Sequence, residues 1–302
     1  MRLYRESKIS GFITKLISLF KDLTCNPIPI NACLHYRYGI MRHRNWGDDL
    51  NIFLLKRLWN RPLNYLYSSI LASRLQRDNY LVIGSTLAML SNSRSIVWGA
   101  GVIDESEKLE CPPKRILAVR GPKTRQWLID RGINCPKVYG DPAMLLAEIY
   151  KPRNTGKRYK LGVIPHYDDF EHQSLQKLKN DPQVLFIRME GYKDWLGLID
   201  DIASCDYIAS SSLHGLIMAE AYHIPNLWIE ISGKLLGGHF KFHDFFLSIG
   251  ADREMPFVIH PNISVEDILN TRVCYKQGNI DLEPLKRASP FPLNLNQIYG
   301  NK

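Results

Sequence analysis

One short stretch of the chain combines residue types that could bind an anion and move a proton: Ser211, Ser212, Leu213, His214 and Gly215. An apolar run precedes this stretch and apolar residues recur at helical spacing after it, which predicts a strand, a tight turn and a helix. A serine there is placed to cap the helix, so His214 falls in the first turn, where backbone amides attract anions. An imidazole in that turn can bind phosphate or carboxylate and can donate a proton. A capped core helix with one solvated histidine is the plainer alternative.

A second polar group follows the first predicted strand, residues 31–36. Asn45, Asp48 and Asp49 lie between that strand and a helix that begins near Leu50. Such a loop, at the carboxyl end of a strand, is where open α/β sheets bind ligands. The three side chains would either cap the helix or point hydroxyl-binding groups into a cleft, and the sequence supports both interpretations equally.

Two further predicted strands, near residues 95–98 and 116–119, end in chemically useful residues. The first runs into the turn Gly99-Ala100-Gly101, which would place backbone amides at one edge of a sheet. This turn is not a dinucleotide fingerprint, because the third glycine is missing. The other strand delivers Arg120, whose guanidinium can hold a carboxylate or phosphate with two hydrogen bonds. A surface arginine is an equally supported alternative.

Strands and helices alternate in the same rhythm through both halves of the chain. This rhythm predicts an α/β fold of two Rossmann-like domains facing across a cleft. A polar stretch with Pro152 and Gly156 favours a linker between them. The expected organisation is a basic amphipathic helix over residues 1–25, one domain over 26–150, a second over 159–270, and a tail over 271–302.

Composition narrows the class of partner. The 302 residues carry 39 Lys plus Arg against 30 Asp plus Glu, a formal charge of +9, which favours anionic partners. No zinc-finger spacing, RNA-recognition signature or long basic run is present, so nucleic acid is not expected. The six cysteines are widely spread and form no CxxC pair, which is typical of reduced thiols in a cytoplasmic protein.

The amino-terminal segment is amphipathic, with one apolar stripe and several cations. The stripe comprises Ile9, Phe12, Ile13, Leu16, Ile17 and Phe20, and the cations are Arg2, Arg5, Lys8, Lys15 and Lys21. No run of the chain is long and apolar enough for a membrane span. A helix of this kind can lie on an anionic membrane surface, so peripheral contact through residues 1–22 at the inner membrane face is one expectation. Packing against its own protein or a partner is the more common alternative.

Taken together, these motifs resemble the polysaccharide pyruvyl transferase family, and most closely the subgroup that places pyruvate ketals on exopolysaccharide sugars. The resemblance covers residues 31–250 and rests on the order and spacing of the motifs at 45–49, 83–85, 98–101, 119–121, 140–143, 210–215 and 241–250. It implies a fold like that of two-domain (GT-B) glycosyltransferases, with the acceptor side in the domain over 26–150 and the donor side in the domain over 159–270. It also implies phosphoenolpyruvate as the donor substrate, without a further cofactor.

The resemblance implies roles for particular residues. His214 and Arg120 would hold or activate the donor, and the chemistry calls for a cationic pocket completed by Lys234 or Lys241. His214 is the candidate acid for the methylene carbon, and Asp48, with Asn45 and Asp49, would orient or deprotonate the acceptor hydroxyls. Cationic side chains can supply the countercharge, so no metal is expected. The acceptor would be a saccharide, either free or lipid-linked.

Two other functions fit the same residues. A glycosyltransferase of this architecture would use a nucleotide sugar, with Glu220 or Glu230 binding ribose hydroxyls. A non-catalytic glycan-assembly protein would keep the fold and lose the chemistry. The joint presence of His214, Arg120 and the loop carboxylates favours an enzyme.

Overall fold

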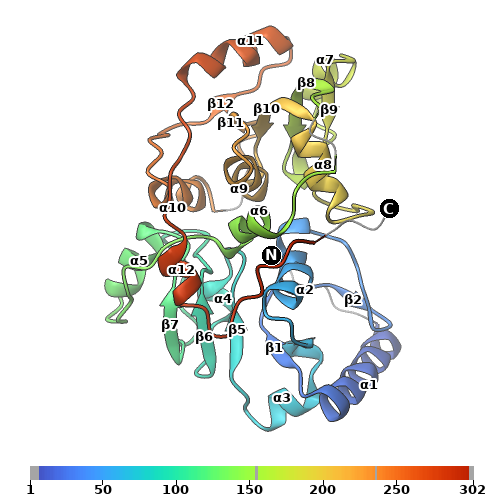
Figure 1. Ribbon diagram of the computed structural model, residues 1–302, viewed down its shortest axis with the longest axis vertical. Coiled ribbons are helices and arrows are strands. Elements are labelled where there is room, and N and C mark those ends of the chain that lie inside the picture. The colour runs from blue at the N-terminus through green and yellow to red at the C-terminus, as the bar shows by residue number, and fades with distance from the viewer. Residues whose placement is uncertain (1–6, 154–155, 235–236, 299–302) are drawn as a thin grey trace. The chain divides into compact units, whose positions relative to one another are not determined.

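The computed structural model (Figure 1) describes residues 7–153, 156–234 and 237–298. The chain divides into two compact units. Unit 1 comprises residues 1–142 and 281–295, and unit 2 comprises residues 143–280 and 296–302. Residues 1–6, which the sequence assigns to the amino-terminal helix, lie outside the described residues.

Unit 1 is built on a parallel sheet of five strands with helices between them. Its helices are α1 (Lys8–Cys25), α2 (Trp46–Leu58), α3 (Ile70–Arg74), α4 (Leu87–Leu90), α5 (Pro122–Ile129) and, from the returning segment, α12 (Glu283–Arg287). The sheet strands are β1 (Ile28–Ile30), β4 (Leu63–Tyr65), β5 (Asn79–Leu81), β6 (Ser95–Trp98) and β7 (Arg115–Ala118). A small hairpin, β2 (Tyr36–Arg37) and β3 (Ile40–Met41), follows β1. The first sheet strand therefore begins three residues before the predicted one.

Unit 2 repeats this plan. Its helices are α6 (Leu146–Ile149), α7 (Gln176–Lys179), α8 (Gly197–Ala203), α9 (Leu213–Ala221), α10 (Phe240–Ser248) and α11 (Val265–Asn270). Its strands are β8 (Tyr159–Ile164), β9 (Val184–Phe186), β10 (Cys205–Ser210), β11 (Asn226–Glu230) and β12 (Phe257–Val258), all paired in parallel. The predicted α/β class is confirmed, and both sheets are parallel, as expected of Rossmann-like domains.

The two sheets have the same strand order. Unit 1 runs β4-β1-β5-β6-β7 and unit 2 runs β12-β11-β10-β8-β9. When the strands of each unit are numbered along the chain, and the unit 2 sheet is read from its β9 edge, both sheets have the order 2-1-3-4-5. In this order the connections leave the first and third strands in opposite directions, which opens a crevice at their carboxyl ends. The crevice lies between β1 and β5 in unit 1 and between β8 and β10 in unit 2.

Apolar side chains at strand and helix spacing form the core of each unit. In unit 1, Leu50, Leu54 and Leu58 recur every fourth residue along α2 and are fully buried. In unit 2, Leu161, Tyr207 and Ile229 come from three adjacent strands and belong to one buried cluster. Each such side chain contributes about 1.5–3 kcal/mol by leaving water. The two crevices therefore stand on packed, rigid sheets.

The unit boundaries differ from those expected from the sequence. The chain passes from unit 1 to unit 2 after Pro142 rather than after residue 150. Tyr150 already belongs to unit 2, where its hydroxyl donates to Asp200 at 2.8 Å. The carboxyl-terminal segment is not a separate tail, because the indole of Trp98 donates to the carbonyl of Leu285 at 2.9 Å. These contacts join residues far apart in sequence, which no local composition signal reports.

Candidate functional site

A hydrogen bond joins the two loops that flank the crevice of unit 2. The backbone amide of His166, after β8, donates to Ser211 Oγ, after β10, at 2.8 Å. The amide of Ser211 donates in turn to the carbonyl of Ile164 at 3.1 Å. Ser211 is 1% exposed, so it fixes the loops rather than facing solvent. This cross-link holds His166 at the carboxyl edge of the sheet.

Gly215, which has no side chain, lets helix α9 begin close to this edge. A Cβ at Gly215 would collide with Ser210 Oγ, which accepts a hydrogen bond from the Ser212 amide at 3.0 Å. Ser212 holds the N-cap position, yet its side chain makes no capping bond among the described residues, contrary to the predicted serine cap. His214, which is 9% exposed, lies in the first turn of α9. The backbone amides of this turn, all within the described residues, donate no hydrogen bond to the Ser212 side chain.

Helix α10 brings a cation to the same edge. Lys241 is 8% exposed, and burial together with this ammonium holds the pKa of the His166 imidazole below its ordinary value. Asp168 and Asp169 oppose that shift, and Asp168 Oδ2 lies 3.5 Å from His166 Nδ1. His166 is therefore neutral near pH 7. The unit 2 edge thus combines a neutral imidazole, a buried ammonium and the amino end of α9.

A hydrogen-bonded pair of side chains lies at the end of the neighbouring strand β11. Glu230 Oε2 is 2.7 Å from His239 Nε2. The imidazole rings of His239 and His243 each stand edge-on to the indole of Trp228. The second imidazole, His243, donates to the carbonyl of Glu254 at 2.8 Å. Across residues 7–153, 156–234 and 237–298, no three His, Cys, Asp or Glu side chains gather as they would around a metal.

In unit 1, the predicted loop carboxylates stand at the start of α2. Asn45 Oδ1 caps this helix by accepting from the backbone amide of Gly47 at 3.1 Å. The cap is therefore the Asn45 side chain and not one of the two carboxylates. Asp48 is half-buried and Asp49 is 1% exposed. Burial, and then the charge of Asp49, raise the pKa of Tyr36 to about 12. Of the two carboxylates, Asp48 is therefore the more exposed to solvent.

A buried amide that the sequence analysis missed ties α2 to the sheet. Asn51, fully buried, accepts from the amide of Ile83 at 3.0 Å and donates to its carbonyl at 2.8 Å. This pairing sets Asp48 against the turn after β5, where a Cβ at Gly84 would lie 3.2 Å from Asp48 Oδ1. Gly84 has a φ of +116°, which favours glycine. An asparagine in the second turn of an amphipathic helix was the available signal.

Arg120 lies inside unit 1 rather than at its surface. Its guanidinium is fully buried, and it donates to Ser85 Oγ at 2.5 Å and to the carbonyl of Val102 at 2.7 Å. The room for it comes from Gly101, because a Cβ there would collide with the guanidinium carbon. Gly99 serves the neighbouring turn, with a φ of +97° and Pro142 packed against it. Arg120 therefore fixes the loops after β5 and β6.

Comparison with known proteins identifies the family of this chain. Residues 23–233 match the sequence profile of the polysaccharide pyruvyl transferase family. The chain belongs to the polysaccharide pyruvyl transferase family. It is similar to the succinoglycan biosynthesis protein ExoV of Rhizobium meliloti (strain 1021), with 26% identity over 70% of this chain and 64% of that protein. It is also similar to an uncharacterized protein of Acanthamoeba polyphaga mimivirus, with 28% identity over 78% of this chain and 83% of that one.

The predicted site residues of this pyruvyl transferase fall into two groups, one in each unit. Ser211, Ser212, Leu213, His214, Gly215 and Lys241 lie in unit 2, and Asn45, Asp48, Asp49, Gly99, Gly101 and Arg120 lie in unit 1. Lys234 is exposed on the segment after β11, where its amide donates to Ser232 Oγ at 3.3 Å. His166 was missed as a candidate, although its place directly after a buried strand was a usable signal. None of the described helices has the length and hydropathy to cross a membrane.

Proposed function

We propose that this pyruvyl transferase takes its pyruvyl group from phosphoenolpyruvate and forms a ketal with two hydroxyls of a saccharide. One observation carries the proposal: Lys241, His166 and the first turn of α9 with His214 converge on one sheet edge. Phosphoenolpyruvate carries a carboxylate and a phosphate, which need an ammonium and backbone amides. The relative named for succinoglycan biosynthesis supports a bacterial-type polysaccharide acceptor.

In this proposal His214 is the acid that starts the reaction. Its imidazolium gives a proton to the methylene carbon of the enol, which leaves a cationic centre at the carbon that bears the phosphate. A sugar hydroxyl attacks that carbon and loses its proton to a carboxylate. Inorganic phosphate leaves and a cationic carbon forms again. A second hydroxyl attacks this carbon, closes the ketal ring and gives its proton to the phosphate. The products are the ketal and phosphate, so no oxidant or reductant is needed. Lys241 offsets the negative charge of the donor, so the reaction as proposed calls on no metal or further cofactor.

The acceptor side of the proposal assigns Asp48 to the sugar hydroxyls. Asp48 is half-buried beside Gly84, and a carboxylate can both accept a hydrogen bond from a hydroxyl and take its proton. Asn45 is engaged as the cap of α2, and Asp49 and Arg120 are enclosed, so these three are proposed to position rather than to touch substrate. The acceptor in this proposal is a saccharide, either free or carried on a lipid.

The nucleotide-sugar alternative loses one of its two candidate residues. Glu220 is 2% exposed, and its carboxylate accepts from Gln277 Nε2 at 2.7 Å and from the amide of Gly278 at 3.0 Å. It also forms an ion pair with Arg253. A carboxylate so fully engaged by the protein has no capacity left to bind ribose hydroxyls. Glu230 keeps partial exposure but pairs with His239.

Ligand-induced thermal stabilisation tests the donor assignment. We expect phosphoenolpyruvate to raise the unfolding midpoint of the wild type, because a ligand that binds only the folded state stabilises it by mass action. A panel of nucleotide sugars should leave the midpoint unchanged, and so should addition of EDTA to the phosphoenolpyruvate sample. Stabilisation by a nucleotide sugar and not by phosphoenolpyruvate would overturn the proposal in favour of sugar transfer.

A further inference from the structure

Helix α1 is oriented opposite to a normal amphipathic surface helix. The residues buried along it are polar and recur every fourth position: Ser10, Thr14, Ser18 and Asp22. The apolar stripe faces outward, with Ile9 70%, Phe12 67%, Leu16 57%, Phe20 69% and Leu23 70% exposed. An amphipathic helix of a globular protein buries its apolar stripe. Helix α1 departs from this rule.

Hydrogen bonds to unit 1 hold the helix in this orientation. The amide of Tyr38 donates to Ser10 Oγ and the amide of Gly39 to Thr14 Oγ1, both at 2.9 Å. Deeper along the helix, Asn64 Nδ2 donates to Ser18 Oγ at 2.7 Å and to Asp22 Oδ1 at 2.8 Å, and Ser69 Oγ donates to Asp22 Oδ2 at 2.6 Å. Turning the apolar stripe inward would break all of these bonds and leave buried polar groups unsatisfied. The outward stripe is therefore a built feature of unit 1.

Neighbouring elements extend the apolar surface. Ile40 of the β2–β3 hairpin is 66% exposed and Leu75, at the end of α3, is 67% exposed. Of the large apolar side chains exposed in the part of the chain that the structure describes, more than half belong to residues 9–75. Contiguous apolar surface of this kind marks a site of interaction. We call the stripe of α1 with Ile40 and Leu75 the apolar face.

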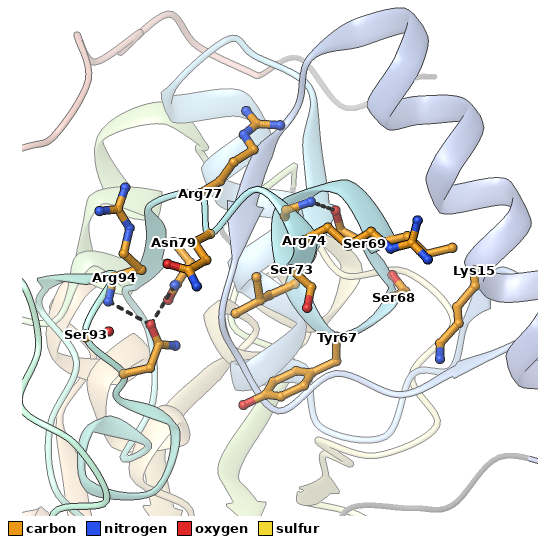
Figure 2. A pocket seen from close by; sticks show the side chains of 15 residues that line it. Lys15, Tyr67, Ser68, Ser69, Ser73, Arg74, Arg77, Asn79, Ser93 and Arg94 are labelled. Carbon is orange, nitrogen blue, oxygen red and sulfur yellow. Dashed lines mark hydrogen bonds between the residues drawn. The ribbon is translucent and has the colours of Figure 1, made fainter.

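A basic pocket opens beside the apolar face. It has a volume of about 570 Å³, and its lining includes Lys15 of α1, Tyr67, Arg74 of α3, Arg77 and Arg94. Figure 2 shows Lys15 and Arg74 on the side of the pocket nearest α1, with Arg77 and Arg94 on the other side. Arg94 pairs with Asp78 at 2.8 Å. Within the described residues, Lys15 and Arg74 have no ion-pair partner, so their charges are available to an anion.

The exposed charged side chains of α1 all have one sign. Lys8, Lys15 and Lys21 of α1 are exposed, and the one acidic residue of this helix, Asp22, is buried against unit 1. Symmetric pairing of two copies through this face would bring like charges together. An anionic membrane surface instead offers acyl chains to the stripe and phosphate headgroups to the cations.

We propose that unit 1 docks on an anionic membrane through the apolar face of α1, and that Lys15 and Arg74 bind the phosphate of a lipid headgroup. The helix lies in the plane of the membrane surface, since it is too polar to span it. This inference does not rest on the proposed donor chemistry. Its failure and that of phosphoenolpyruvate binding are measured separately.

Co-sedimentation of the full chain with lipid vesicles tests the apolar half of the proposal. We expect binding to vesicles containing phosphatidylglycerol and little binding to pure phosphatidylcholine. The double variant Phe12→Ser/Phe20→Ser should weaken partitioning about hundredfold, because each buried phenyl ring accounts for about a tenfold change. The matched control Met255→Ser/Val273→Ser removes two side chains that are 73% and 89% exposed elsewhere and should change nothing. Point variants are preferable to deletion of α1, which would uncover Asn64 and Ser69.

A second pair of variants tests the pocket. Lys15→Ala/Arg74→Ala should weaken binding to phosphatidylglycerol vesicles about 25-fold, because each surface cation accounts for about a fivefold change. Lys160→Ala/Lys193→Ala removes the same net charge from exposed sites in unit 2 and should have a much smaller effect. Equal losses in the two double variants would reduce the pocket to general electrostatics and overturn the headgroup assignment.

The oligomeric state decides the other outcome. A wild type that fails to sediment with phosphatidylglycerol vesicles overturns the membrane proposal. If that protein is also a dimer that Phe12→Ser/Phe20→Ser converts to a monomer, a second copy covers the apolar face instead. Circular dichroism melts of each variant control for folding, and we expect unchanged midpoints because every substituted side chain is exposed or lines the pocket.

Discussion

The backbone amide of His166 and the hydroxyl of Ser211 form a 2.8 Å hydrogen bond that joins the loops after β8 and β10. These two strands are neighbours in the sheet, and their loops leave in opposite directions, so a crevice opens where the bond lies. Removing this bond is therefore the simplest test of the geometry of the unit 2 edge.

Replacing Ser211 by alanine should destabilise unit 2. The amide of His166 would lose its buried acceptor, at a cost of about 1–3 kcal/mol in the free energy of unfolding. Ser212→Ala serves as the matched control, because the Ser212 side chain is half-buried and makes no capping bond among the described residues. Urea denaturation of both variants makes the comparison. Equal stability of the two would show that the His166–Ser211 bond does not hold the crevice.

A substitution at Gly101 that clashes with Arg120 tests whether the Arg120 guanidinium is buried at this position. Gly101→Ala puts a methyl group against the buried guanidinium and should cost about 2 kcal/mol in the free energy of unfolding. In an Arg120→Ala background the same change should cost almost nothing, because the space is then empty. A double-mutant cycle by urea denaturation measures this coupling. Strict additivity of the two changes would contradict the enclosed position of Arg120.

The amide side chains of Asn51 and Asn45 should differ in importance. Asn51→Ala removes two buried hydrogen bonds to Ile83 and should cost about 3 kcal/mol in the free energy of unfolding. Asn45→Ala removes only a helix cap and should cost about 1 kcal/mol. Thermal melts of the two variants give the ranking. A larger loss for Asn45→Ala would reverse the assignment of Asn51 as the residue that ties α2 to the sheet.

The neutral state of His166 predicts a pH dependence. Burial and Lys241 lower its pKa in the folded chain below the ordinary value of 6.5. As the pH falls through 6.5 the unfolded chain takes up a proton that the folded chain does not, so stability decreases toward acid. His166→Gln lacks this proton and should lose less stability between pH 8 and pH 5 than the wild type does. Parallel stability curves for the two proteins would show that folding does not lower the pKa of His166 and would contradict this environment.

The local sequence pattern was sufficient to predict the helices and strands but not the contacts between them. Strand and helix rhythm predicted two α/β units, and the residue types around His214 predicted a polar sheet edge. The common strand order could not be predicted, because pairing of β1 with both β4 and β5 joins residues far apart in sequence. The enclosure of Arg120 depends on Gly101, from another loop.

Helix α1 illustrates a second limit. Its apolar stripe and its polar stripe have the same helical period, so periodicity identifies the helix and leaves its orientation undecided. The polar stripe is chosen for burial because Asn64 and Ser69, on other elements, supply partners for Ser18 and Asp22. Such partners are visible only once the chain is folded.

The most direct test of the proposed chemistry is calorimetric titration of phosphoenolpyruvate into the wild type and into Lys241→Gln. Loss of one charge-assisted hydrogen bond should weaken the affinity at least about tenfold. The matched control Lys193→Gln, at an exposed site in the same unit, should bind as the wild type does. Unchanged affinity in Lys241→Gln, or no binding of phosphoenolpyruvate by the wild type, would contradict a donor site at the unit 2 edge.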